Sequence, residues 1–180
     1  GVSGPWIAGD IEELYSAGVQ KVIIFGNCGV LDSKIEDCSI IIPTKGFRDE
    51  GTSYHYVSPS ETIQINPDYK EDFIKILNEY NFVYTEGFTW TTDAFYRETK
   101  DKMKYFKDNG AVCVEMEGTV IASVCQRLNM KYFTFYYAGD NLDSTVWDKR
   151  SLEGLINFDK KKEVLLLALE LAVILNEDKY

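Results

Sequence analysis

The segment Ala111-Val112-Cys113-Val114-Glu115-Met116-Glu117-Gly118 carries most of the information about the fold and its site. Four strand-type apolar residues are followed directly by two carboxylates around a methionine, and then by a helical pattern. In open α/β sheets, ligands bind in the crevice beyond the carboxyl ends of the strands. A carboxylate there can accept hydrogen bonds from adjacent sugar hydroxyls, and a methionine offers soft apolar contact. Glu115, Met116 and Glu117 are therefore candidate sugar-binding residues.

The same junction has a plainer explanation. A carboxylate just before a helix is favoured by the exposed N–H groups and by the helix dipole. Glu117 could therefore simply cap the helix expected at residues 119–128. Local sequence alone leaves both uses open.

Size and charge limit the function classes. The chain has 180 residues, and we expect one domain over residues 1–180 that buries roughly 70% of the unfolded surface. Its formal net charge of −10 argues against a nucleic-acid partner, because such binding depends on clustered lysine and arginine. Apolar runs fall short of the ~20 residues that span a bilayer, so we expect no membrane insertion.

The cysteines and the single histidine predict a protein of a reducing compartment that has no metal site. Cys28, Cys38, Cys113 and Cys125 contain no C-x-x-C pair and lie in apolar segments, as in reduced cytoplasmic proteins. With His55 as the single histidine, a zinc site is not expected. We therefore predict a cytoplasmic protein that holds no metal.

Apolar runs of strand length alternate with segments of helical period, which is typical of a mainly parallel sheet covered by helices. We expect an α/β fold with a mixed, mainly parallel central sheet flanked by helices in an αβα arrangement. A loop is expected at residues 43–60, and its length favours a functional role. Strands are expected at residues 21–25, 38–42, 82–90, 111–114 and 131–137. Helices are expected at residues 7–15, 67–80, 98–107, 119–128 and 159–175.

Three further places could carry chemistry. The glycines of Gly26-Asn27-Cys28-Gly29 let backbone N–H groups approach an anion or a flat ligand, although such a pair also makes ordinary tight connections. Asp140 follows a buried strand and could act as a general acid, or could form an Asx turn with its neighbours. Phe95 could stack on a planar base or belong to the core.

The order and spacing of these segments resemble the nucleoside phosphorylase family, which includes purine and uridine phosphorylases and related nucleosidases. The resemblance extends from Gly1-Val2-Ser3-Gly4-Pro5 to the terminal helix. Val114-Glu115-Met116-Glu117 before a helix is its most specific mark. The segments that carry the resemblance are residues 26–29, 48–56, 92–96, 114–118 and 139–140.

The resemblance implies roles for the sugar and base. Glu117 would accept hydrogen bonds from the ribose hydroxyls, and Met116 would pack on the sugar. Phe95 would lie against the base, and the backbone around Cys28 and Gly29 would border it. The expected fold is that of a phosphorylase.

The resemblance also implies roles in catalysis. Asn27 stands where family members contact phosphate through a serine or threonine. Asp140 matches the aspartate that protonates the purine, with Arg150 as its orienting partner. Nucleoside and phosphate are the expected partners, phosphate being a co-substrate and no cofactor being required. The family also implies a homo-oligomer, either a dimer or a trimer of dimers.

Two departures keep alternatives open. Ile24 occupies the position of a phosphate-binding arginine, which members that use water also lack. Family strands that precede this segment are not in the sequence, so the chain resembles the carboxyl-terminal two-thirds of the family fold. Phosphorolysis of a purine nucleoside is the first expectation, favoured by Asp140. Hydrolysis, a uridine phosphorylase suggested by residues 48–56, and non-catalytic nucleoside binding are the alternatives.

Overall fold

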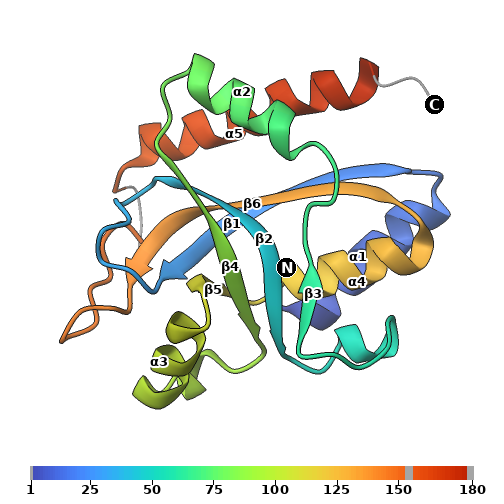
Figure 1. Ribbon diagram of the computed structural model, residues 1–180. Coiled ribbons are helices and arrows are strands. Elements are labelled where there is room, and N and C mark those ends of the chain that lie inside the picture. The colour runs from blue at the N-terminus through green and yellow to red at the C-terminus, as the bar shows by residue number, and fades with distance from the viewer. Residues whose placement is uncertain (1, 153–155, 178–180) are drawn as a thin grey trace.

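The computed structural model describes residues 2–152 and 156–177 (Figure 1). Its six strands form one sheet in the order β3-β2-β4-β5-β1-β6. The strands are β1 (Lys21–Val30), β2 (Ile40–Asp49), β3 (Thr62–Gln64), β4 (Tyr84–Thr92), β5 (Ala111–Glu115) and β6 (Lys131–Asn141). The helices are α1 (Gly4–Ser16), α2 (Lys70–Glu79), α3 (Lys100–Asp108), α4 (Gly118–Leu128) and α5 (Phe158–Glu177), with short 3-10 helices η1 (Ser53–His55) and η2 (Phe95–Arg97).

The sheet closes on itself. β2 pairs with β4 and also, over Ile40 and Ile41, with β6, so that five strands form a ring. The long pairings β1–β6 and β2–β4 are parallel, whereas each antiparallel pairing spans two or three residue pairs. Register shifts in β1, β2 and β4 supply local bends of the kind that bulges produce. The expected mixed, mainly parallel sheet flanked by helices is confirmed.

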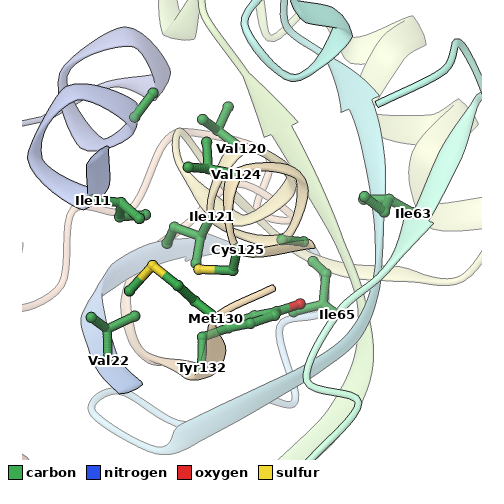
Figure 2. Packing of buried hydrophobic residues seen from close by; sticks show 12 residues of the cluster. Ile11, Val22, Ile63, Ile65, Val120, Ile121, Val124, Cys125, Met130 and Tyr132 are labelled. Carbon is green, nitrogen blue, oxygen red and sulfur yellow. The ribbon is translucent and has the colours of Figure 1, made fainter. Parts of the chain in front are cut away.

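Helices cover two sides of the sheet (Figure 1). On one side α1 packs against α4, and Figure 2 shows Val120, Ile121 and Val124 of α4 directed at Ile11 of α1 and at the strands. On the other side α2 and α5 cover a second cluster that contains Phe73, Phe133 and Phe135. α3 lies apart from both pairs, near β5.

Local signals set several helix ends. The Thr99 hydroxyl accepts a hydrogen bond from the backbone N–H of Lys102 at 3.4 Å and caps α3. Gly18, with φ +94°, and Gly110, with φ +98°, follow α1 and α3, where a left-handed residue commonly ends a helix. Asn129 ends α4 in the same way, with φ 55°.

Several predicted boundaries were wrong. β1 continues through the expected glycine turn to Val30, and β6 continues through the expected turn to Asn141, because the two strands keep pairing with each other there. β2 takes up the first part of the expected loop at residues 43–60, and β3, which was not predicted, pairs with it. α2 begins at Lys70, after rather than at Pro67.

Candidate active site

The carboxyl ends of two groups of parallel strands meet at the centre of the site. β5 is parallel to β4, and β1 is parallel to β6, but β1 crosses β5 in the antiparallel sense with Gly29 opposite Val114. The last residues of β5 and β1 therefore overlap for two pairs. Residues that follow either strand group are brought to one place.

Glycine is required where β1, β5 and β6 converge. A Cβ atom at Gly29 would lie 3.1 Å from Asp140 Oδ1 and 3.2 Å from Val114 Cγ1, and would also collide with Leu142. The backbone of Gly139 approaches the Cys28 carbonyl oxygen just as closely, since an added Cβ would lie 3.3 Å from it. The sequence-predicted Cys28, Gly29 and Asp140 thus lie together.

Asn27 is exposed beside this centre. Its Nδ2 would lie 3.5 Å from a Cβ placed on Gly139, so the side chain reaches the β6 side of β1. Ile24, three residues earlier, packs against the apolar cluster around α1 and α4. The position at which the family resemblance implies an arginine therefore holds a partly buried apolar side chain here.

Glu115 ends β5 with both carboxylate oxygens engaged inside the protein. Oε1 accepts hydrogen bonds from the hydroxyls of Thr89, at 3.0 Å, and Thr91, at 2.6 Å. Oε2 accepts from the backbone N–H groups of Glu117, at 2.7 Å, and Gly118, at 2.6 Å. The carboxylate that caps the start of α4 is therefore Glu115 and not Glu117.

Glu117 is half-buried and is held at one oxygen. Its Oε1 accepts a hydrogen bond from the backbone N–H of Ser3 at 2.6 Å, and its side chain does not cap α4. Burial raises the pKa of the Glu117 carboxyl, against the opposing effect of the Ser3 hydrogen bond. Met116 beside it is also half-buried. Both side chains keep part of their surface exposed at the start of α4.

Asp140 has a partner that the sequence did not indicate. Its Oδ2 accepts a hydrogen bond from the indole N–H of Trp147 at 2.6 Å. The predicted orienting partner, Arg150, instead donates to the carbonyl oxygen of Ile35 at 2.8 Å and lies 3.6 Å from Asp148 Oδ2. The pairing of Arg150 with Asp140 was wrong. Because Asn141 accepts from the N–H of Asp143, the Asx turn expected at Asp140 belongs to Asn141.

The η2 segment brings an aromatic pair and an unexpected acid. Phe95 is 52% exposed and packs against Tyr96 rather than in the core, with ring centroids 4.3 Å apart and ring planes tilted by 44°. Glu98 directly follows η2 and is half-buried near Asp140. Desolvation, followed by the charge of Asp140, raises the pKa of the Glu98 carboxyl from 4.5 to about 7. Sequence reasoning missed Glu98, because nothing near it in the chain reveals a neighbour 42 positions away.

The site is electrostatically acidic. Burial raises the pKa of the Cys28 thiol well above its usual range, and the neighbouring Cys113, Glu115 and Asp140 act in the same direction. Within residues 2–152 and 156–177, no lysine or arginine forms an ion pair with Glu98, Glu117 or Asp140. The carboxyls of Glu98 and Glu117 hold their protons more firmly than they would in water.

The segment around Arg48 is held together by contacts among its own residues. Arg48 is buried, donates from Nε to the Ser53 hydroxyl at 2.8 Å, and stacks on Tyr54 at 4.0 Å. Glu50 accepts hydrogen bonds from the backbone and hydroxyl of Ser53 and from the Thr119 hydroxyl of α4. These contacts fix the turn after β2 against α4.

Two other kinds of site have no candidate in the described part of the chain. None of its helices combines the length and the apolarity needed to cross a bilayer. Across those same residues, no group of three or more histidine, cysteine, aspartate or glutamate side chains is arranged to hold a metal ion. A cavity of about 640 Å³ lies elsewhere, between β1 and α5.

A family model described as the phosphorylase superfamily matches residues 11–174. The chain belongs to this superfamily. An uncharacterised protein of Acanthamoeba polyphaga mimivirus is 31% identical over 133 residues, which are 74% of this chain and 51% of that protein. Guanosine phosphorylase of Halorubrum lacusprofundi is 24% identical over 131 residues, which are 73% of this chain and 54% of the relative.

The fold is also that of solved relatives. The crystal structure of purine nucleoside phosphorylase from Toxoplasma gondii, in complex with immucillin-H, matches with a TM-score of 0.85 at 17% identity, covering 99% of this chain and 73% of that one. Other relatives are named as uridine phosphorylase and as 5'-methylthioadenosine/S-adenosylhomocysteine nucleosidase. The chain spans about half the length of the first curated relatives it matches.

Proposed function

We propose that the protein cleaves the N-glycosidic bond of a purine nucleoside, with phosphate as the acceptor, to give the free base and ribose 1-phosphate. The observation that carries this proposal is the position of two carboxyls, Glu117 just after β5 and Asp140 near the end of β6, on the two strands that flank Cys28 and Gly29 of β1. Membership of the phosphorylase superfamily supports it. No cofactor is proposed besides the co-substrate.

Residues at the start of α4 would bind the sugar. Glu117 retains acceptor capacity beyond its Ser3 hydrogen bond and would accept from the ribose hydroxyls. Met116 would pack on the sugar ring. Holding the ribose fixed while positive character develops at its anomeric carbon places the sugar for in-line attack.

Residues of η2 and of the ends of β1 and β6 would bind the base. Phe95 is exposed and offers a ring face for the base, while the backbone of Cys28 and Gly29 would border it. Bond cleavage leaves negative charge on the base, so a proton delivered from the carboxyls at Asp140 would stabilise the leaving group. This favours a purine, whose ring nitrogen can take that proton.

Hydrolysis is the second candidate, and Ile24 favours it. A phosphate dianion is best held by a guanidinium, but the position expected to supply one is an apolar side chain packed in the α1–α4 cluster. Asn27 is exposed beside Gly139 and could contact phosphate or hold a water molecule. A nucleosidase would use the same sugar and base contacts.

A nucleoside panel assayed with and without phosphate tests the proposal. Phosphorolysis predicts base release that depends on phosphate and yields ribose 1-phosphate. Base release without phosphate, yielding free ribose, would select hydrolysis, and preference for uridine would select the pyrimidine alternative. Nucleoside binding by calorimetry without any base release would reject both enzymes in favour of a binding protein.

We also propose a cytoplasmic location, because the cysteines are not oxidised. Cys28, Cys38, Cys113 and Cys125 are all free and buried, which suits a reducing cytoplasm. Fractionation of cells that express the protein, followed by immunodetection, tests the cytoplasmic location.

A further inference from the structure

The side chain of Trp147 reaches back to the strand end that precedes its own loop. Its indole N–H donates a hydrogen bond to Oδ2 of Asp140 at 2.6 Å, although the two residues are seven positions apart along the chain. Tryptophan side chains are highly buried on average, but 57% of Trp147 is exposed. Core packing therefore does not explain where this indole lies, whereas the contact with Asp140 does.

The loop that carries Trp147 is closed and anchored. Asn141 and Asp148 form a β-bridge across it, in which the N–H of Asn141 donates to the carbonyl oxygen of Asp148 at 2.8 Å and the N–H of Asp148 donates back at 3.3 Å. Within the loop, the carboxylate of Asp143 forms an ion pair with Lys107 of α3. The loop therefore holds the indole of Trp147 in a fixed place.

The two oxygens of the Asp140 carboxyl face different groups. Oδ2 accepts from the indole, whereas Oδ1 lies toward Gly29 of β1, since a Cβ atom built on Gly29 would lie 3.1 Å from it. The terminal torsion of an aspartate is broad and nearly two-fold, so a carboxyl without a partner would exchange these two positions. An indole N–H can only donate, and an acidic proton on Oδ2 would compete with it. A proton on Asp140 is therefore best placed on Oδ1, on the side where the base is proposed to bind.

We propose that Trp147 is the positioning residue of Asp140, and that its indole N–H keeps Oδ1 as the oxygen that delivers a proton to the departing base. The inference rests on the proposed function. The bond from the anomeric carbon to the base nitrogen breaks, and its electron pair stays with the base. The proton on Oδ1 then moves to a purine ring nitrogen, phosphate or water attacks the sugar carbon, and Asp140 is left as a carboxylate. After the base departs, Asp140 takes a proton from solvent.

The contact can be measured without turnover. The chain has three tryptophans, so NMR spectra of the ¹⁵N-labelled protein contain three indole N–H signals. Trp147→Phe identifies the signal of Trp147, which should shift and exchange faster with water in Asp140→Ala, because its acceptor has been removed. Trp6, which is 60% exposed on α1, is the matched control, and its signal should stay unchanged in Asp140→Ala. A Trp147 signal that does not respond to Asp140→Ala overturns the proposal.

Kinetics then separate positioning from packing. Trp147→Phe keeps an aromatic ring but removes the donor, and for a purine nucleoside it should lower kcat ~10-fold or more while KM stays within about twofold, because a misplaced reacting group slows the chemical step. 7-Methylguanosine, whose base already carries positive charge, should be affected much less. In Asp140→Asn protein, adding Trp147→Phe should cause little further loss, since residues that act as a unit are not additive. Trp6→Phe should match the wild type.

The failures are distinguishable. Wild-type protein that cleaves no nucleoside contradicts the proposed function, while the NMR spectra still test the contact. Active wild-type protein whose Trp147→Phe variant keeps its full rate contradicts the role of Trp147 alone. Equal losses on both substrates, or a full further loss in Asp140→Asn protein, also reject positioning, because they would show that Trp147 acts independently of Asp140.

Discussion

Glu115 and Glu117 lie two positions apart at the end of β5, yet their carboxylates meet different surroundings. Glu115 accepts four hydrogen bonds from threonine hydroxyls and from the first N–H groups at α4. Glu117 accepts one, from the Ser3 backbone. Only Glu117 therefore has capacity left for a ligand, and substitutions at the two positions should separate binding from stability.

Replacing Glu117 by alanine should weaken turnover while the fold survives. The lost acceptor for ribose hydroxyls should cost on the order of 2 to 3 kcal/mol in kcat/KM. Steady-state kinetics with circular dichroism on the same samples measures both effects. Glu117→Gln is the matched control for local damage, because glutamine has the size and shape of glutamate and can still accept the Ser3 hydrogen bond. Full activity in the folded fraction of Glu117→Ala would reject the ribose role.

Ionisation of Glu98 should also make the stability of the folded protein depend on pH. Its pKa in the folded protein, about 7, exceeds its ordinary value of 4.5, so its neutral form favours folding at low pH, and this contribution is lost as pH rises through about 7. Glu98→Gln, which cannot ionise, should therefore match the wild type near pH 4 and be more stable near pH 8, by on the order of 1 kcal/mol after solvent screening. Urea unfolding at several pH values measures this. A pH-independent difference would contradict the shift.

Sequence reasoning at this scale was right about which residues the ends of strands bring together. Cys28, Gly29 and Asp140 lie together as expected, because the strand ends bring them there. It failed where the role depends on a tertiary neighbour. Trp147 and not Arg150 reaches Asp140, and Glu98 is coupled to Asp140 only through the fold.

At the scale of elements, the junction of β5 and α4 depends on Glu115. Glu115→Ala would leave the hydroxyls of Thr89 and Thr91 and two backbone N–H groups without their acceptor in a buried place. The free energy of unfolding should fall by about 3 kcal/mol or more. Urea denaturation compared with Glu117→Ala, which removes one half-buried acceptor, measures the difference. Equal losses for the two variants would contradict this division of roles.

Element types were predicted better than element ends. Among the described residues, periodicity placed all five α-helices and five of the six strands, but β1 and β6 both run past their glycines. Each strand continues because the other offers it a parallel partner through Asn27 and Tyr137, a pairing between residues 110 apart. β3 has three residues and is held by its register with β2, so no sequence periodicity could mark it.

At the scale of the whole molecule, we expect a homo-oligomer. Leu165, Leu169 and Val173 of α5 are about half exposed beside the cavity against β1, and Trp6 is 60% exposed, whereas Trp90 is fully buried. Light scattering at assay concentration should report a mass above that of one chain. Leu165→Lys with Leu169→Lys should lower that mass, while Val83→Lys, at an exposed site after α2, should not. An active monomer would contradict the expectation.

The pairing of β1 with β6 also has a consequence for biosynthesis. Lys21 lies opposite Lys131, so the partner of the first strand leaves the ribosome 110 residues after it. At ~5–20 residues per second, the nascent β1 waits on the order of 5 to 20 s with its apolar residues uncovered. The pairing of β2 with β6, which closes the ring of strands, is delayed in the same way, because Ile40 pairs with Tyr137, which is synthesised much later. Chaperones that bind extended apolar segments therefore have a defined interval in which to act.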